Sequence, residues 1–430
     1  MKTKKNTDTG GRPKPNIAMF LIACMFFLGT IIACACGIPV KHVMQVYSYD
    51  VLVILLVMEL FTNLIVETGV MQMLAIRIAD LSQGRKRLCL VMFGLMMFLI
   101  SSLLNNITAV MMVLPIVFVL LKSLDVDKRY VCIFFCTILA LSNTGGAASP
   151  IGDFPAIVIM TSGITSFLGY LTHAFPLFAL TSAALVLVWG FRVRAEQNSD
   201  AVRKLAVSNL KSQYKHARVR YDVLILLIVV FACMFIAWSL VPQEMIPPEI
   251  IAILGYAAAI TICSIKGLKI SMHIELQSPL TIASFLYFAA VIRQTGILVD
   301  LANYLQSSIS NPKLLMMVIM IVVSGAAGVF SAGPAAAAMM PIIVNICNGP
   351  LGTKSDWIAV AYAASICAGS SLFMWSATAG FILSERVNRA GICDAEERQI
   401  SWGILQYFPY GIVNYLIQIG IALITVGLVL

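Results

Sequence analysis

Charged residues are scarce in this chain of 430 amino acids. Only 11% of the positions are Asp, Glu, Lys or Arg, while 60% are hydrophobic, and long apolar runs recur along the whole sequence. A transmembrane helix needs about 20 mostly apolar residues. The composition therefore excludes an ordinary soluble protein and predicts an integral membrane protein with many spans.

Several motifs are also absent. No segment of about 10 residues has the polar and apolar alternation of an outer-membrane barrel strand. The cysteines form no C-x-x-C pair, and no Cys/His cluster has the spacing of metal ligands. The sequence contains no H-E-x-x-H, G-x-S-x-G or paired-aspartate motif. We therefore expect an all-α polytopic membrane protein that is not an enzyme and has no metal centre or cofactor.

The Lys and Arg residues lie between the apolar runs, so they predict membrane topology rather than nucleic-acid binding. Nearly all of them share one side if 88–121 and 314–347 are re-entrant hairpins that enter the membrane from opposite faces. By the positive-inside rule that side is the cytoplasm, which puts the N-terminus inside and the C-terminus outside. The exceptions among the 29 basic residues are Lys41, Lys313, Lys354 and Arg293.

Three segments of the first half match three of the second in the same order. They are "LVMELFTNLIVETGV" (57–71) with "SFLYFAAVIRQTGIL" (284–298), "LLNNITAVMMVLP" (103–115) with "VFSAGPAAAAMMP" (329–341), and "GGAASPIGDFPAIV" (145–158) with "GSSLFMWSATAGFI" (369–382). Because the two hairpins enter from opposite faces, the repeats are inverted, as in many secondary transporters.

The hypothesis of two inverted repeats predicts the organisation of the whole chain. The expected parts are a cytoplasmic tail (1–16), a first span with an external loop (17–49), repeat 1 (50–191, with hairpin 88–121 and broken helix 130–160), a basic cytoplasmic linker (192–220), two connecting spans (221–278), and repeat 2 (279–430, with hairpin 314–347 and broken helix 357–383).

Helix-breaking residues interrupt four of these segments. Glycine permits open backbone, proline removes a donor, and irregular backbone at membrane depth is tolerated only inside protein or beside a wet cavity. Half-helix N-termini attract anions, and carbonyl ends can bind Na+. We expect the four breaks to meet near the bilayer midplane, at 105–108, 142–155, 331–334 and 369–378.

Three acidic residues lie within predicted spans, and a charge there is costly enough to suggest function. Asp153 lies inside the first broken helix, where its carboxylate could hold Na+, carry a proton or cap a half-helix. Glu67 could reach water or pair with Arg77, and Glu59 could line a cavity or pair with another helix. The one basic residue in a span, Arg293, could neutralise an anion or reach the outer interface.

Two motifs carry a family resemblance. "LLNNITAVMMVLPIV" (103–117) followed by "SNTGGAASPIGDFPAIVI" (142–159) resembles the signature of the ion transporter superfamily, which includes arsenite pumps, NhaD-type sodium/proton antiporters and citrate or dicarboxylate carriers. The ending "ISWGILQYFPYGIVNYLIQIGIALITVGLVL" (400–430) is similar to the arsenite and NhaD-type branch. The resemblance covers 50–430. It implies inverted repeats, a hairpin and a broken helix in each, a midplane site, and a homodimer with elevator-like motion.

Carried over by position, the resemblance places the site in both halves. The second half departs from the family pattern, because Ser331, Gly333 and Pro334 stand where the family usually has Asn or Asp, and Met374, Trp375 and Ser376 replace Pro-Ile-Gly. We therefore expect the second half of the site to be less polar than the first. The expected Na+ position is near Asn106, Gly145 and Asp153. The predicted substrate- or ion-binding residues are Asn105, Asn106, Thr108, Ser142, Asn143, Thr144, Gly145, Gly146, Gly152, Asp153, Ser331, Gly333, Gly369, Ser370, Ser371, Ser376 and Thr378.

These features favour a secondary active transporter that moves a small anion, either a carboxylate or an oxyanion, coupled to Na+ or H+ by alternating access. A Na+/H+ antiporter with Asp153 as the exchanging carboxylate is the alternative, and an ion channel is a minor one. The expected partners are the small ion, the lipid bilayer and a second copy of the chain, without nucleic acid. The expected location is the plasma membrane or a bacterial inner membrane.

Overall fold

The structure, a computed structural model, describes residues 17–194, 199–214, 219–242, 245–268, 277–349, 352–394 and 396–430. Within these ranges the regular elements are helices, apart from one isolated β-bridge between Cys393 and Gln399. The predicted cytoplasmic tail, 1–16, lies outside the described residues.

Eight of the described helices are long and apolar enough to cross a membrane. This confirms the prediction of an all-helical polytopic membrane protein. The eight are α3 (Tyr49–Glu67), α6 (Asn106–Ser123), α7 (Lys128–Ala147), α9 (Phe167–Arg192), α11 (Tyr221–Leu240), α12 (Pro248–Ile265), α15 (Pro312–Phe330) and α19 (Ile404–Val429).

Shorter helices complete the fold. Three of them were not predicted as separate helices: α4 and α14 lie within the predicted repeats, before the predicted hairpins, and α10 lies in the predicted basic linker. The shorter elements are α1 (Ile17–Ala35), α2 (Val40–Gln45), α4 (Val70–Leu81), α5 (Lys86–Ser101), α8 (Phe154–Thr161), α10 (Asp200–Gln213), α13 (Gln277–Gln294), α14 (Ile297–Ser308), α16 (Ala332–Cys347), the 3-10 turn Gly352–Lys354, α17 (Ser355–Ser370) and α18 (Gly380–Ala390).

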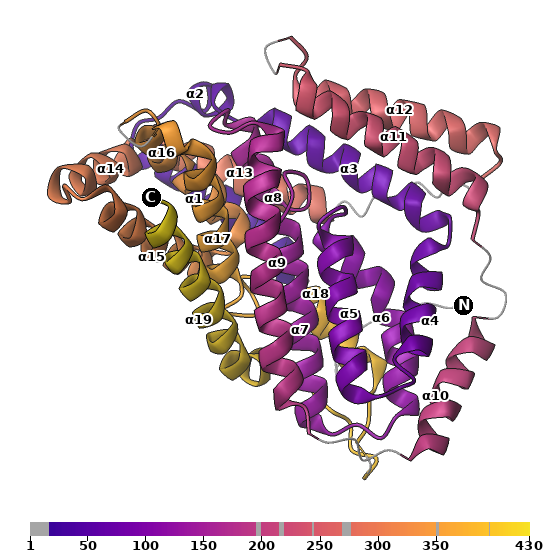
Figure 1. The fold of residues 1–430 in the computed structure, drawn as a ribbon. Coiled ribbons are helices and arrows are strands. Elements are labelled where there is room, and N and C mark those ends of the chain that lie inside the picture. Colours follow the sequence, from indigo (N-terminus) through magenta and orange to yellow (C-terminus); the bar gives the residue numbers. More distant parts are fainter. Residues whose placement is uncertain are drawn as a thin grey trace, which may run out of the picture.

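The helices from α3 to α9 correspond in order to those from α13 to α19 (Figure 1). In each series, two helices joined by a short bend (α5 with α6, α15 with α16) precede a helix that stops and resumes after a break (α7 with α8, α17 with α18). Packing follows the same order, since α5 packs on α7 and α7 on α9, while α15 packs on α17 and α17 on α19.

Two Thr-Gly pairs mark equivalent bends in the two series. Gly69, before α4, has φ +79°, and Gly296, before α14, has φ +75°, a left-handed conformation that glycine adopts without steric cost. The preceding threonines donate their hydroxyl hydrogens to carbonyls three residues earlier, Thr68 to Ile65 and Thr295 to Ile292. The repeated local structure explains why a segment that reads as one apolar run changes direction at both places.

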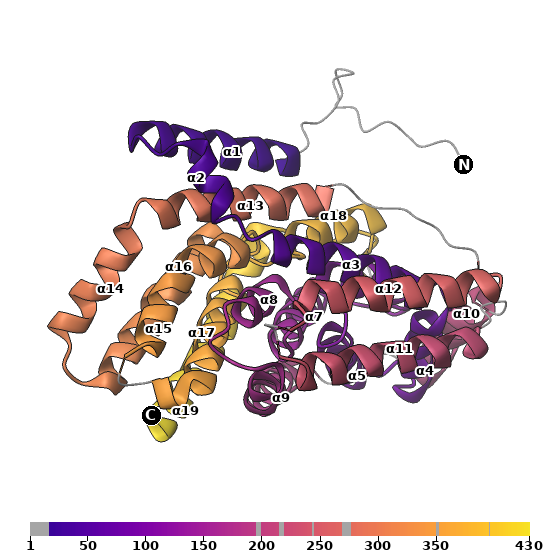
Figure 2. The same ribbon diagram turned by 90° about the horizontal axis from the view of Figure 1, so that it is seen from above.

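The outer helices cross over between the halves. Although α1 precedes the first series, it packs on α13, and although α12 precedes the second series, it packs on α3 (Figure 2). The linker helix α10 packs on α4 and α6. Each series is therefore flanked by a helix from the other half of the sequence.

The centre of the molecule is formed by α7 and α17, which are buried along almost their whole lengths. Glycines allow close approach of their neighbours. A Cβ atom at Gly145 would overlap the backbone carbonyl of Phe98 in α5, and one at Gly369 would overlap the carbonyl of Ser324 in α15. The tight α5–α7 and α15–α17 contacts hold the two breaks, 148–153 and 371–379, near the middle of the fold.

Candidate substrate and ion site

Asp153 lies at the end of the first break, directly before α8, and only 7% of its surface is exposed. One carboxylate oxygen, Oδ1, accepts the backbone N–H of Phe154 at 2.9 Å. The other, Oδ2, accepts Nδ2 of Asn106 at 2.8 Å and the hydroxyl of Thr378 at 3.4 Å. Asp153 therefore caps α8 and also joins the start of α6 to the second break.

Asn106 is fully buried and has an unused acceptor. Its Nδ2 faces the Asp153 carboxylate, because an amide oxygen there would be repelled, and its Oδ1 accepts no hydrogen bond from any described residue. Leaving a buried polar atom unpaired costs about 1–3 kcal/mol. An oxygen acceptor next to a carboxylate is the arrangement that a small cation or a proton donor would satisfy.

Glycine is required on the inner side of this pair. A Cβ atom at Gly146 would overlap the amide of Asn106 and the Cβ of Asp153, and one at Gly152 would overlap the carbonyls of Gly146 and Ser101. Gly145 has a different role, since it packs on α5. The glycine that adjoins the Asn106–Asp153 pair is thus Gly146.

A serine pair ties each helix bend to the break of the same series. In the first half, the hydroxyl of Ser149 donates to the carbonyl of Ser102. In the second half, the hydroxyl of Ser331 donates to the carbonyl of Ser376 at 3.1 Å, and the N–H of Ala332 donates to the same carbonyl at 3.2 Å. In the first half the break supplies the donor and the bend supplies the acceptor, and in the second half these roles are reversed.

Backbone strain accompanies the second bend. Ser331 has φ +81° and ψ 157°, a region that only glycine adopts easily. The carbonyl of Ser376 holds it there, and the hydroxyl of Ser376 donates to Phe373 at 2.7 Å and to Ser370 at 3.1 Å. Strained residues of this kind cluster at functional sites. Ser331 and Ser376 therefore shape the second half of the site through backbone contacts.

A small cavity adjoins Asp153 on the side of α17. Its volume is about 10 Å³, roughly that of one water molecule. The amide of Asn143, from the first half, donates to two hydroxyls of the second half, those of Ser370 at 3.4 Å and Ser371 at 3.5 Å. The residues lining the cavity are Asn143, Ala147, Asp153, Pro155, Ala332, Ala363, Ile366, Cys367 and Ser370.

The structure brings only some of the predicted residues to this cavity or to Asp153. Those are Asn106, Asn143, Gly146, Asp153, Ser370 and Thr378. Gly152 and Ser376 shape the two breaks, Ser331 holds the second bend, and Gly333 lies against Phe285 and Phe154.

Other predicted residues point elsewhere. The side chain of Asn105 accepts the N–H of Ile107 as the cap of α6, and Thr108 is half-buried in the first turn of that helix. Ser142 hydrogen-bonds to Ser101 at 3.1 Å and Thr144 to Ser182 at 2.8 Å. Ser371 accepts from Asn143 but donates away from the cavity, to Gln418 at 3.4 Å. Gly145 and Gly369 are packing positions.

The remaining charged candidates lie away from the cavity. Glu59 is half-buried in the middle of α3, while Glu67 and Arg293 are exposed at the ends of α3 and α13. None of the three lines the cavity. Within the described residues, no group of three or more His, Cys, Asp or Glu side chains could hold a metal ion.

A polar cluster on α19 was not predicted from the sequence. Asn414 Oδ1 accepts the indole N–H of Trp189 at 2.8 Å, and the hydroxyl of Tyr407 donates to the carbonyl of Ser371 at 2.7 Å. Asn414 and Gln418 are buried and four positions apart in an otherwise apolar helix. That spacing puts both amides on one helical face and could have identified them.

Three hydrogen bonds join the halves at a common sequence separation. The pairs Asp153–Thr378 and Trp189–Asn414 are each 225 positions apart, and Asn143–Ser370 is 227 apart. These separations agree with the offset between the matching motifs. With the offset of 224 between the motifs at the breaks, each bond joins a residue to a position one to three residues from its counterpart in the other half.

Comparison with solved structures supports the fold. The Alcanivorax borkumensis YdaH transporter aligns with a TM-score of 0.55 over 96% of this chain and 97% of that chain, at 11% sequence identity. At this identity the likeness concerns the fold alone.

Sequence comparison identifies transporters. An uncharacterized transporter of Mycobacterium tuberculosis is 24% identical over 353 residues (80% of this chain, 79% of the relative). The magnetosome protein MamN of Paramagnetospirillum magneticum is 24% identical over 343 residues (80% and 77%). The model of the CitMHS citrate transporter family matches residues 9–367, which confirms both the resemblance to the ion transporter superfamily and the prediction that the protein is not an enzyme. The fold is a helical membrane fold with paired helix breaks and a buried carboxylate between them. Because this family model matches most of its length, the chain belongs to the CitMHS family of citrate transporters.

Proposed function

We propose that the protein is a secondary active transporter that carries a small carboxylate of the citrate type across the membrane, coupled to Na+ or H+ by alternating access. The observation that carries this proposal is the carboxylate of Asp153, which is 7% exposed and bonded to Asn106 and Thr378 from both halves of the chain. A buried acid shared between two halves can respond to an ion on one side and transmit the change to the other.

We further propose that the two series are inverted repeats, with re-entrant hairpins at 88–121 and 314–347, the N-terminus in the cytoplasm and the C-terminus outside. The distribution of Lys and Arg residues supports this topology. The three bonds between nearly corresponding positions also support it, because residues near an approximate two-fold axis lie close to their own counterparts.

The coupling ion is assigned to the neighbourhood of the Asn106–Asp153 pair. The free Oδ1 of Asn106 and the carboxylate of Asp153 supply oxygen ligands, and backbone carbonyls of the first break can complete them. If the ion is H+, Asp153 itself is the carrier. In both cases a bound cation offsets the cost of a buried negative charge.

The anionic substrate is assigned to the side of the cavity formed by the second half. The N-terminus of α16 begins there at Ala332, and Asn143 and Ser370 supply neutral donors. The cavity of about 10 Å³ is too small for a tricarboxylate. Substrate therefore enters in a second conformation in which the breaks and the α15–α16 bend separate.

Purified protein in proteoliposomes tests the function. We expect citrate or a related carboxylate to accumulate when an inward Na+ or H+ gradient is imposed, and its uptake to stop when the gradient is collapsed.

Aspartate-to-asparagine replacement keeps the side-chain shape and removes the charge. Asp153→Asn should reduce gradient-driven uptake by at least about tenfold, since the charge is costly to bury and has a role only if an ion binds it. Asp300→Asn, on the exposed part of α14, is the matched control.

The alternative is Na+/H+ antiport with Asp153 as the exchanging group, favoured by the single carboxylate at the site. The same vesicles separate the two functions. Proton movement driven by Na+ with no anion present would establish antiport and contradict carboxylate transport. An ion channel would instead give flux that neither saturates nor follows an imposed gradient of a second ion.

We also propose that the working unit is a homodimer in a plasma membrane or bacterial inner membrane, with elevator-like movement of the helices that carry the breaks. The family resemblance supports the dimer. Mass measurement of the protein in lipid nanodiscs tests it, and a single copy per active particle would exclude it.

A further inference from the structure

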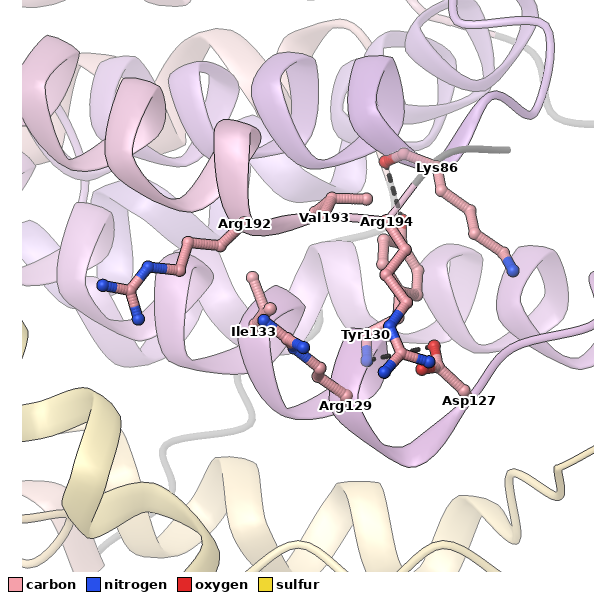
Figure 3. Close-up of a pocket in the computed structure, with 8 residues that line it drawn as sticks. All are labelled: Lys86, Asp127, Arg129, Tyr130, Ile133, Arg192, Val193 and Arg194. Carbon is pink, nitrogen blue, oxygen red and sulfur yellow. Dashed lines mark hydrogen bonds between the residues drawn. The ribbon is translucent and has the colours of Figure 1, made fainter. Parts of the chain in front are cut away.

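A second pocket lies far from Asp153, where three helices end together (Figure 3). Lys86 comes from the start of α5, Asp127 and Arg129 from the start of α7, and Arg192 and Arg194 from the end of α9. Tyr130, Ile133 and Val193 complete its wall. The pocket therefore gathers side chains from three helices of the series that contains the first break.

The charge of this pocket is strongly positive. Four basic residues and one acidic residue line it. The acidic residue is Asp127, whose carboxylate accepts the N–H of Tyr130 at 3.3 Å as the cap of α7. Among the described residues, Arg129, Arg192 and Arg194 have no ion-pair partner. Cations held close together repel one another, and a bound anion removes that repulsion.

The basic side chains line different parts of the pocket wall. Lys86 is only 6% exposed, and its ammonium lies 5.9 Å from the ring centre of Tyr130, whose hydroxyl donates to the Lys86 carbonyl at 2.9 Å. Figure 3 shows the guanidinium group of Arg194 directed toward Asp127 and that of Arg129 directed away from it. Guanidinium groups bind phosphate oxygens in pairs.

Apolar surface begins directly beside the basic pocket. On α5, Leu88, Leu95 and Leu99 are 39%, 40% and 54% exposed and recur at intervals of seven and four, which places them on one face. On α9, the same spacing recurs for a more exposed set, Leu180, Leu187 and Phe191, with exposures of 59%, 58% and 76%. A charged pocket at the end of two apolar stripes matches the shape of a phospholipid.

We propose that this pocket binds the phosphate headgroup of an anionic phospholipid, with the acyl chains along the exposed faces of α5 and α9. Basic pockets between transmembrane helices on the cytoplasmic side bind such headgroups. Under the topology proposed above, the pocket faces the inner leaflet. The bound lipid links the starts of α5 and α7 to the end of α9, and α7 leads directly to the break that contains Asp153.

Lipid retention by the full-length protein tests this proposal. The protein is purified from membranes containing phosphatidylglycerol and phosphatidylcholine, and bound lipid is counted by native mass spectrometry. The double variant Arg129→Gln/Arg194→Gln removes two pocket charges. The control double variant Arg77→Gln/Arg386→Gln removes two exposed charges on α4 and α18. Melting temperature in detergent verifies that all variants are folded.

We expect the pocket variant to bind phosphatidylglycerol about tenfold more weakly than the parent, since each basic residue near a membrane surface contributes severalfold to affinity, and the control to retain parental binding. Equal loss in both variants would show a nonspecific charge effect and overturn the pocket. Unchanged binding in the pocket variant would do the same. Displacement of the lipid by glycerol phosphate, which lacks acyl chains, would show that a soluble anion is the ligand.

Discussion

At the scale of single residues, the site depends on how Asp153 is satisfied. Its two oxygens receive donors from the first residue of α8, from α6 and from the second break. The bond to Asn106 is the shorter of the two side-chain bonds, at 2.8 Å against 3.4 Å for Thr378. We infer that Asn106 holds the Asp153 carboxylate in position, and that the bond from Thr378 makes the carboxylate sensitive to the position of the second half.

Replacement of Thr378 by valine tests that role. Valine keeps the shape of threonine but cannot donate to Asp153, and loss of one hydrogen bond to a charged group costs about 1.5–3 kcal/mol. We expect the concentration of coupling ion needed for half-maximal uptake to change by roughly tenfold, with little change in melting temperature. Thr425→Val is the control, because its hydroxyl bonds only to Ile421 of its own helix. Equal ion dependence in both variants would remove Thr378 from the site.

At the scale of helices, close packing holds the breaks in place. Gly145 and Gly369 allow α7 and α17 to contact the backbones of α5 and α15, and the serine pairs fasten the bends to the breaks. Each of these contacts is made to a backbone carbonyl, so the side chains of the residues that supply those carbonyls can differ between the halves while the arrangement stays the same. The apolar second half of the cavity therefore does not weaken the frame around it.

Glycine-to-alanine replacement measures this packing. Gly145→Ala and Gly369→Ala each place a methyl group against a backbone carbonyl, and such overpacking costs about 1–3 kcal/mol. We expect both variants to melt several degrees lower and to transport more slowly. Gly325→Ala, in α15 with nothing within 4 Å of its added Cβ, should match the parent. A parental melting temperature for Gly145→Ala would contradict the close approach.

Ser331→Ala tests the link between the second bend and the second break. The change removes the bond from the Ser331 hydroxyl to the Ser376 carbonyl and leaves a strained backbone at φ +81° with one fewer contact to hold it. We expect faster proteolysis or cysteine labelling at the bend and weaker substrate affinity. Ser307→Ala, whose hydroxyl bonds only to Tyr304 within exposed α14, is the control. Unchanged labelling and affinity would show that the serine bond does not hold the bend.

At the scale of the whole molecule, hydrogen bonds between nearly corresponding positions join the two series. Asp153–Thr378, Asn143–Ser370 and Trp189–Asn414 lie in the breaks, in the central helices and between α9 and α19. The helices α1 and α12 lie on opposite series, so each half supports the other. This arrangement suits a carrier whose site lies between two related halves.

Reporter fusions test the proposed orientation. Alkaline phosphatase is active only outside the cytoplasm of bacteria, while green fluorescent protein exported through the general secretory route does not fluoresce. We expect an active phosphatase after Leu430 and fluorescence when the fluorescent protein is inserted after Gln213 at the end of α10. The reverse pattern would invert the topology. Activity of the same reporter at both places would contradict the number of crossings between them.

The sequence by itself determined the features that depend on neighbouring residues. The length of apolar runs predicted helical spans, glycine and proline predicted the breaks around 142–155 and 369–378, and the cost of a buried charge selected Asp153. Each of these follows from local chemistry, which a single segment contains.

Only the tertiary structure decided which residues meet. It paired Asp153 with Asn106, 47 positions away, and with Thr378, 225 positions away, assigned Gly145 to packing and Gly146 to the site, and brought α5, α7 and α9 together around a basic pocket. Contacts across such separations depend on how helices pack, and helix packing is set by the fit of all the side chains at once. No segment of the sequence contains that information alone.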